Sequence, residues 1–333
     1  MVIAAPRYSM SISDSRATTI KRRWPATCAG LLVGVVAALW PVSELQAYET
    51  DPFTNRLMVL RDSGPVLNRE VNRTIAEIAA HWSGPPSEKR FVDAIFHRIG
   101  GYYWVDQLEN WAMKSPDVEK SPTPRFHSFY RALPLYASRV SGLFGIGPSF
   151  QIGPTLVGTD KIGHFLSQGR KFWRRWKKSG DEAQAAEHSA FTERAIFGAL
   201  TTGTYSNADL VANYEGYRFY RSLFEDNVIA GKPAILRWQD DHWVVQRDFD
   251  WNDHVNAYWD EGLDINDYDR WMTGPVRHHL LDYCADWRQA PERYAINADE
   301  DAALQSRYNM LQLKLRPELR LAAICSESVP ASP

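Results

Sequence analysis

Apolar residues beyond residue 65 recur mainly at three- and four-residue intervals, the spacing that places them on one face of a helix. The pattern predicts helices at 67–82 and 91–99 and a shorter helical stripe at 104–112. Three prolines between residues 115 and 124 then interrupt the chain. They predict a loop, which is a possible boundary between subdomains.

Glycine and proline punctuate residues 142–158, so this segment cannot form one long helix. Apolar residues on both sides of Asp240-Asp241 predict a β-hairpin at about 234–250. Further helices are expected from Asp160 to Lys178, at 181–200, from Ser206 onward, and near 252–260, 274–288, 298–314 and 316–325. The expected fold is therefore mainly α: a helical globular domain with one small hairpin and glycine-rich connections.

The first 47 residues have the order of a secretory signal peptide. Lys21-Arg22-Arg23 precede an apolar run from Thr27 to Trp40, and a polar segment then leads to Ala47. The run has about 14 residues, fewer than the roughly 20 that a spanning helix needs. We therefore expect cleavage near Ala47 and a periplasmic or secreted protein with a single domain over 48–333. The alternative is an uncleaved leader that anchors the protein in the membrane.

Charge and composition exclude two classes of protein. The 333 residues include 38 Lys+Arg and 40 Asp+Glu, whereas a nucleic-acid-binding protein normally carries a basic excess. The chain is 13% aromatic and 23% charged, which excludes a disordered protein. Removal of residues 1–47 takes away five basic and two acidic side chains and changes the formal charge from −2 to −5.

Leader removal also leaves only two cysteines, Cys284 and Cys325. In an oxidising compartment such a pair most simply forms a disulfide, which would stabilise the fold by roughly 4 kcal/mol in the chain-entropy model. Two buried free thiols are the alternative. The absence of C-x-x-C pairs argues against a structural zinc site.

The motif Asp160-Lys161-Ile162-Gly163-His164-Phe165 is the main candidate for chemistry. On a helix Asp160 and His164 share one face, while Lys161 points about 100° away. A carboxylate one turn from an imidazole can orient it as a general base, or both groups can bind a metal ion. The alternative is that Asp160 caps the helix and His164 is a half-buried structural histidine.

A second polar cluster follows on the next two helices. Glu193 lies in the first of them, and Asp209 and Asn213 lie four residues apart in the second, where Ser206 and Asp209 resemble a capping box. Apolar residues surround these side chains, so they need polar partners if they are buried. The natural partners are in the 160–164 motif. Helix capping with a structural hydrogen-bond network is the alternative.

These motifs together resemble the signature of VanZ-like proteins and of related small bacterial envelope proteins of unknown function. The resemblance is carried by D-K-x-x-H-F and by the later S-x-x-D-L-x-A-N-x-x-G, and it covers roughly residues 156–222. It implies a shared polar centre of Asp160, Lys161, His164, Glu193, Asp209 and Asn213. VanZ-like proteins are membrane-embedded and associated with glycopeptide tolerance. This chain departs from them in its export leader and its lack of spanning segments, so neither property is transferred.

Two other charged segments are weaker candidates. Asp253-His254 and the acidic stretch at 260–269 could bind calcium, but the spacing breaks the EF-hand pattern, and a solvated acidic loop is the simpler expectation. The basic residues from Arg170 to Lys178 alternate with aromatic residues. That helix could lie on an anionic membrane surface, or it could turn an aromatic stripe to the core and a basic face to solvent.

Two functional hypotheses follow. The first is an exported, non-enzymatic envelope protein with no cofactor, whose polar centre organises the helices and whose basic surface binds lipid or an envelope protein. The second is an envelope hydrolase with His164 as base or ligand, Asp160 orienting it, and Asp209 or Glu193 as second acid or ligand. In its metal-assisted form, Asp160, His164 and Asp209 would hold a divalent ion. An open cleft would favour the enzyme, and a sealed core would favour the structural role.

Overall fold

The computed structural model describes residues 49–101, 105–121, 123, 127–132, 146–194 and 203–327. The chain forms two units, Met1–Glu44 and Leu45–Pro333, and only the second contains described residues. The predicted leader at 1–47 therefore lies outside the described residues.

The fold is mainly helical, as the apolar spacing predicts. The α-helices of the described part are α2 (Gly64–Ala80), α3 (Glu88–Ile99), α4 (Gln107–Lys114), α5 (Asp160–Gly163), α6 (Gly169–Ser179), α7 (Glu182–Thr192), α8 (Asn207–Ser222), α9 (Arg270–Leu280), α10 (Cys284–Gln289), α11 (Ala298–Arg307) and α12 (Leu321–Glu327). A π-helical stretch, η4 (His164–Gln168), joins α5 to α6. The end of the predicted helix at 181–200 lies outside the described residues.

Short 3₁₀ helices connect the larger elements: η3 (Phe129–Ala132), η6 (Trp251–Asp253), η7 (Ala257–Trp259), η8 (Leu281–Tyr283), η9 (Pro291–Tyr294), η10 (Asn309–Leu311) and η11 (Pro317–Leu319). The helix predicted near 252–260 is thus two 3₁₀ turns rather than one α-helix. None of the described helices combines the length and the apolar character needed to cross a bilayer.

The predicted hairpin is formed by β7 (Leu236–Gln239) and β8 (His242–Val245). Its turn residues Asp240 and Asp241 have φ of 48° and 61°, a left-handed conformation that short polar side chains tolerate. A second hairpin, β4 (Ser149–Ile152) with β5 (Thr155–Gly158), was not predicted, because the glycines around it obscure the strand pattern.

The remaining strands are two residues long. β2 (Lys120–Ser121), in the predicted loop at 115–124, extends the β4–β5 hairpin to a three-stranded antiparallel sheet. β1 (Glu49–Thr50) pairs in parallel with β3 (Ile146–Gly147), and β6 (Thr204–Tyr205) pairs antiparallel with β9 (Asp267–Tyr268). These pairings tie distant chain segments to the helices that carry the polar motifs.

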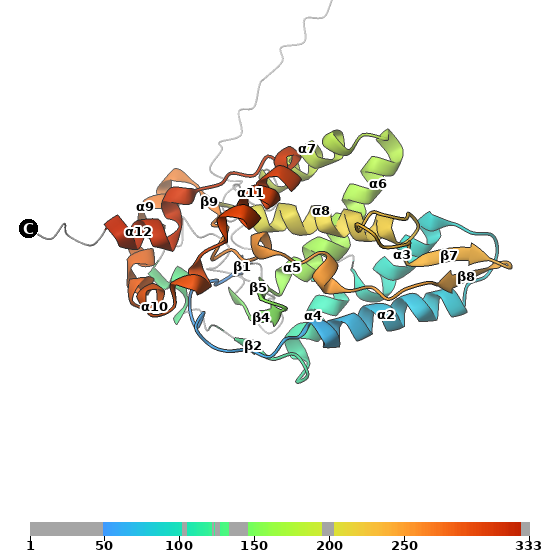
Figure 1. The fold of residues 1–333 in the computed structure, drawn as a ribbon, viewed down its shortest axis with the longest axis horizontal. Coiled ribbons are helices and arrows are strands. Elements are labelled where there is room, and N and C mark those ends of the chain that lie inside the picture. The colour runs from blue at the N-terminus through green and yellow to red at the C-terminus, as the bar shows by residue number, and fades with distance from the viewer. Residues whose placement is uncertain are drawn as a thin grey trace, which may run out of the picture. The chain divides into compact units, whose positions relative to one another are not determined.

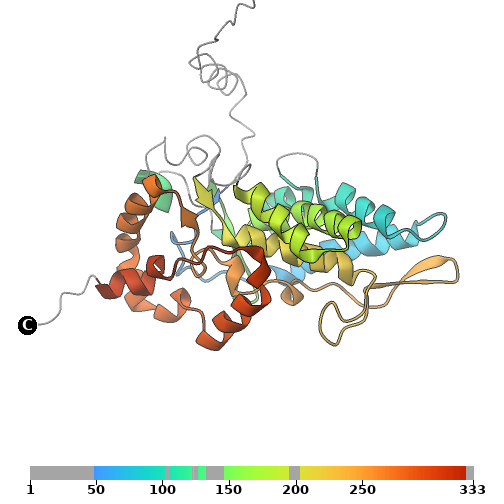
Figure 2. The ribbon, with the colours of Figure 1, turned by 90° about the horizontal axis from the view of Figure 1, so that it is seen from above.

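Helix α8 runs through the middle of the folded unit, and the α6–α7 hairpin packs beside it (Figure 1). Figure 2 shows the same hairpin and α8 from above. Fourteen of the 16 residues of α8 are buried. The polar side chains of this helix must therefore find their partners inside the protein.

A second hydrophobic cluster joins α9, α10 and α12 at the C-terminal end of the unit (Figure 1). Within it, Cys284 of α10 and Cys325 of α12 form the predicted disulfide, with their Cα atoms 5.5 Å apart. The disulfide closes a long segment of chain within this cluster, which is distinct from the cluster around α8.

Two glycines allow the π-helical stretch and α6 to approach α8 closely. A Cβ atom at Gly216 would lie 1.9 Å from the carbonyl oxygen of Phe165, and one at Gly169 would lie 2.6 Å from the Cα atom of Gly216. Neither position has room for a side chain. This contact fixes the position along α8 that His164, at the start of η4, faces.

We predict that Gly216→Ala lowers the free energy of unfolding by about 1–3 kcal/mol or more, because the added methyl group overpacks the α6–α8 contact. The matched control is Gly274→Ala in α9, where an added Cβ has no neighbour within 4 Å apart from the adjoining residues of the chain. That variant should change the free energy of unfolding by less than about 1 kcal/mol, because the better helix propensity of alanine is opposed by the crowding of its Cβ against the following Pro275. Urea unfolding measures both, and a Gly216→Ala protein as stable as the native one would contradict the close approach.

Candidate functional site

The ammonium group of Lys161 is the centre of the buried polar cluster. Its Nζ atom lies 2.6 Å from Asp160 Oδ2, 2.6 Å from Asp209 Oδ1 and 2.8 Å from Glu261 Oε1. The Lys161 side chain is 1% exposed. Burial by itself lowers the pKa of Lys161, but the three carboxylates together hold it well above its usual value. The lysine is therefore a buried cation.

Asp160 is held by its neighbours and does not cap its helix. Its Oδ1 atom accepts a hydrogen bond of 2.9 Å from Thr50 Oγ1. The N-cap position belongs to Thr159, whose side chain makes no capping bond, so the capping alternative for Asp160 is wrong. Helical geometry predicts that Lys161 points away from Asp160, yet its long, flexible stem brings the ammonium back to that carboxylate.

His164 lies at the edge of this cluster. Its Nε2 atom is 3.1 Å from Asp209 Oδ2, and its Nδ1 atom is 3.0 Å from Asn213 Oδ1. Asn213 in turn donates to Ser189 Oγ of α7 at 3.2 Å. The His164 side chain is 18% exposed, more than Lys161 or Asp209. Both ring nitrogens are thus within hydrogen-bond distance of protein oxygens.

Glu193 lies outside the direct contacts of Lys161 and His164. It is buried and accepts a long hydrogen bond of 3.5 Å from the backbone N–H of Ser206. Ser206 caps α8 as predicted, because its Oγ atom accepts from the N–H of Asp209. The same hydroxyl donates to Glu261 Oε1 at 2.8 Å. In a capping box, the side chain of Asp209 would accept a hydrogen bond from the backbone N–H of Ser206. Here Glu193 accepts that hydrogen bond instead.

The structure thus brings five of the six predicted residues into one chain of contacts and connects Glu193 to it through Ser206. The third carboxylate of Lys161 was missed. Glu261 belongs to the acidic stretch at 260–269, and its members Asp260, Glu261 and Asp264 are buried rather than solvated. The expectation of a solvated loop is therefore wrong for this part of the stretch.

These buried acids have different partners. Asp260 forms two hydrogen bonds of 2.8 Å with the guanidinium of Arg56. Asp264 forms no ion pair with any described residue, and burial raises its pKa to about 8. Burial also raises the pKa of Glu261, although Lys161 opposes the shift. No spacing rule distinguishes such a segment from a solvated one, because its burial depends on contacts with Arg56 and Lys161 from distant parts of the chain.

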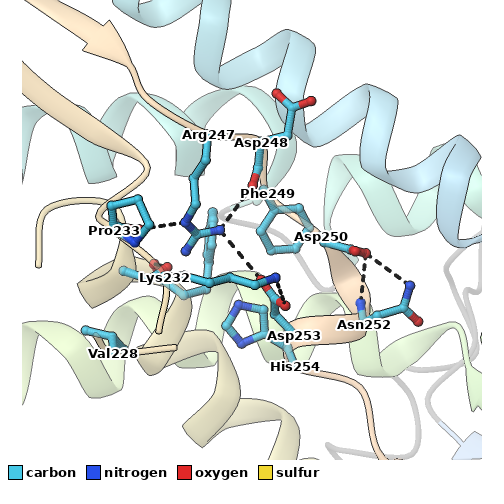
Figure 3. A network of polar contacts seen from close by, with 12 residues as sticks. Val228, Lys232, Pro233, Arg247, Asp248, Phe249, Asp250, Asn252, Asp253 and His254 are labelled. Atoms are coloured by element: carbon cyan, nitrogen blue, oxygen red, sulfur yellow. Dashed lines mark hydrogen bonds and ion pairs between the residues drawn. The ribbon is translucent and has the colours of Figure 1, made fainter. Parts of the chain in front are cut away.

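Asp253 and His254 also have protein partners instead of a free ligand position, and Figure 3 shows those of Asp253. Lys232 Nζ lies 2.5 Å from Asp253 Oδ1, and Arg247 Nη1 lies 3.6 Å from Asp253 Oδ2. His254 is buried, with Nδ1 3.1 Å from Glu215 Oε2, and burial lowers its pKa. Two cations already neutralise Asp253, so the described contacts give no support to calcium binding here.

A second pair of acids, from the start of α4, lies against α5 and η4, and sequence reasoning missed it too. Asp106 caps α4 and accepts hydrogen bonds of 2.6 and 2.7 Å from Ser167 Oγ, and burial raises its pKa to about 7. Glu109 lies against Gly163, where an added Cβ would be 2.6 Å from Glu109 Oε2. Burial, followed by the charges of Asp160 and Asp106, holds the pKa of Glu109 well above its usual value. Its environment therefore favours the neutral form of Glu109 beside the charged cluster.

Asp160, His164 and Asp209 are also the residues that could hold a metal ion. One ligand atom from each lies within 4.8 Å of the others, and the two carboxylates and one imidazole are suitable ligands for a divalent ion. Both carboxylates already share the Lys161 ammonium. The ligand set fits a metal in type and spacing, but a second cation there would be repelled by Lys161.

The approach to His164 from solvent is narrow. Among the described residues, it is a recess lined by His164, Gln168, Arg175, Ser189, Glu193 and Asn213. The recess leaves no space for a water-sized sphere, although the edge of the His164 ring is accessible. The centre is thus a nearly closed polar core with one accessible imidazole edge.

We predict that Asp106→Asn flattens the dependence of stability on pH. The folded protein keeps the Asp106 proton up to about pH 7, whereas the unfolded chain releases it near pH 4. Between these values the unfolded state binds fewer protons, so stability falls as pH rises, by at most about 1.4 kcal/mol per pH unit.

Asparagine keeps the helix cap and a hydrogen-bond partner for Ser167 while it removes this titration. Urea unfolding from pH 4.5 to 7 measures the slope, with Asp117→Asn at an exposed position as the control. Identical slopes for the native protein and Asp106→Asn would contradict the assignment.

Comparison of the chain with protein-family models, with curated proteins and with solved structures returns no match. The likeness to VanZ-like proteins stays a prediction from the motif residues. The function is therefore inferred from the geometry of the site.

Proposed function

We propose that the chain is an exported cell-envelope protein without catalytic activity, in which the Lys161 cluster joins the helices and the basic face of α6 binds an anionic envelope component. One observation carries the first part of the proposal. The Lys161 ammonium already binds the two carboxylates that a metal ion would need. A buried ion pair of this kind is difficult to open, because separation leaves unpaired charges in the interior.

The contacts of His164 support the same proposal. A general base needs a ring nitrogen directed at the proton it removes, within hydrogen-bond reach of the substrate. Both nitrogens of His164 face side chains of α8, Asp209 and Asn213. No hydroxyl or thiol of the described residues forms a hydrogen bond with either nitrogen. The arrangement suits a histidine that fixes η4 against α8.

The exposed side of α6 supports the binding role. Phe172 and Trp173 are buried, so the aromatic stripe faces the core. Arg170, although part of the basic run, is also buried and binds Asp93. Arg174 and Lys178 are exposed and have no ion-pair partner among the described residues. Unpaired cations on one helix attract anionic surfaces.

The metal-assisted hydrolase is the second candidate, because Asp160, His164 and Asp209 have ligand spacing and the His164 edge is accessible. It requires Lys161 to leave the carboxylates or to lose its charge. The structural role therefore requires a charged Lys161 bound to both carboxylates, whereas the metal-assisted hydrolase requires carboxylates that Lys161 does not occupy.

We predict that Lys161→Met lowers the free energy of unfolding by about 3–5 kcal/mol, because three carboxylates lose their shared cation. Lys177→Met is the matched control. Lys177 is exposed and binds Glu88 at the surface, so its loss should cost less than about 1 kcal/mol. Chemical unfolding measures both variants.

Elemental analysis of native protein purified without chelators measures its metal content. This second test does not depend on whether Lys161→Met folds. The proposal predicts no stoichiometric metal. One equivalent of a divalent metal that is lost in His164→Ala would contradict it and establish the metal centre.

A further inference from the structure

A groove lies between α6 and α7, close to the polar centre. It has a volume of about 540 Å³ and is lined by Arg175 and Lys178 from α6 and by His188 and Phe191 from α7, among others. Arg175 also lines the recess beside His164. The groove therefore lies next to the polar centre, with the Arg175 side chain common to both hollows.

Arg175 is half-buried, yet its guanidinium has no hydrogen-bond or ion-pair partner among the described residues. Burial lowers the pKa of Arg175, which shows that the surroundings disfavour its charge. Other arginines with little exposure each bind a carboxylate: Arg56 with Asp260, Arg170 with Asp93 and Arg218 with Glu215. A partly desolvated guanidinium without a counter-ion costs free energy, and an anion from outside the chain would recover it.

The charges around Arg175 indicate what kind of anion fits. Lys178 lies three residues further along the same face of α6 and is exposed without an ion-pair partner in the described part of the chain. Lys171 lies four residues before Arg175, and its pKa is lowered first by burial and then by the Arg175 charge. Glu187, on α7, is the acid that lines the groove, and it is exposed. Adjacent cations of this kind suit phosphate, which a guanidinium can bind through two parallel hydrogen bonds.

Part of the groove lining is apolar. Phe191 is 57% exposed, one of the few large hydrophobic side chains of the described chain that reach solvent, and buried Ala185 of the same helix also lines the groove. An exposed phenyl ring next to unpaired cations matches a ligand with a charged head and an apolar tail.

We infer that the α6–α7 groove binds the phosphate group of an anionic lipid, with Arg175 and Lys178 holding the phosphate and Phe191 contacting the first carbons of an acyl chain. The inference rests on the proposed binding role of α6. It adds that one lipid molecule binds at one defined site on each protein chain. Binding at this site differs from general attraction to a charged surface, because it depends on Arg175 inside the groove and not on the exposed Arg174.

The test is calorimetric titration of the full chain with dihexanoyl-phosphatidylglycerol below its micelle concentration, with the phosphatidylcholine analogue and inorganic phosphate as further probes. We expect 1:1 binding of the phosphatidylglycerol probe, weaker binding of phosphate at the same site, and no binding of the phosphatidylcholine probe. Arg175→Gln should weaken binding of the phosphatidylglycerol probe at least tenfold, because a charge-assisted contact is lost.

Arg174→Gln is the matched control, since Arg174 is the adjacent arginine, is exposed and does not line the groove. It should change the affinity for the soluble phosphatidylglycerol probe less than twofold, whereas its part in the exposed basic face of α6 should appear as weaker binding to anionic vesicles. Phe191→Ala should weaken binding of the phosphatidylglycerol probe but not of phosphate, which distinguishes a lipid from free phosphate. Arg175→Gln should also melt no lower than the native protein, because it removes a guanidinium that has no partner among the described residues.

Equal weakening by Arg174→Gln and Arg175→Gln would overturn the groove and leave the proposed surface role of α6 intact. An absence of saturable binding would overturn the groove as well, and an absence of binding to anionic vesicles would overturn the surface role. Phosphate that binds as tightly as the phosphatidylglycerol probe, with no effect of Phe191→Ala, would exclude a lipid as the occupant.

Discussion

One buried ammonium group holds together three parts of this fold. Lys161 comes from the short helix α5, Asp209 from the first turn of α8, and Glu261 from the loop that follows η7, and all three meet at hydrogen-bond distance. Removal of the ammonium would leave three carboxylates without their shared cation in a region from which water is largely excluded. The cluster therefore fixes the relative positions of these elements more strictly than apolar packing alone would.

The same cluster affects the protonation of a neighbouring acid, Glu109. Three carboxylates around one ammonium leave an excess of negative charge, so further buried carboxyl groups are disfavoured as anions. Burial raises the pKa of both Glu109 and Asp106, and the charge of Asp160 adds to the shift of Glu109, which Gly163 gives the space to approach. The carboxylates around Lys161 thus carry an excess of negative charge. The guanidinium of Arg175, which has no partner among the described residues, carries positive charge further along the chain on α6. The interior and the groove therefore have opposite electrostatic character.

The local parts of this arrangement could be predicted from the sequence. The helices follow from apolar spacing. The one-turn separations of Asp160 from His164 and of Asp209 from Asn213 place each pair on one helix face, and His164 does contact Asp209 and Asn213. Glu261 could not be identified, because its burial depends on contacts more than fifty residues away in sequence. The sequence does not distinguish Arg174 from Arg175, because both belong to the same basic run. Only the approach of α7 makes one of them an exposed cation and the other a groove residue.

The charge and the partners of Lys161 are the central claim, and NMR of protein with ¹⁵N-labelled lysine side chains tests them most directly. We predict one slowly exchanging ammonium signal that is coupled to three protons, is absent from Lys161→Arg, persists above pH 9 and does not change when zinc is added. A neutral amine signal at neutral pH, or a signal that disappears with one equivalent of zinc, would contradict this claim and restore the metal centre.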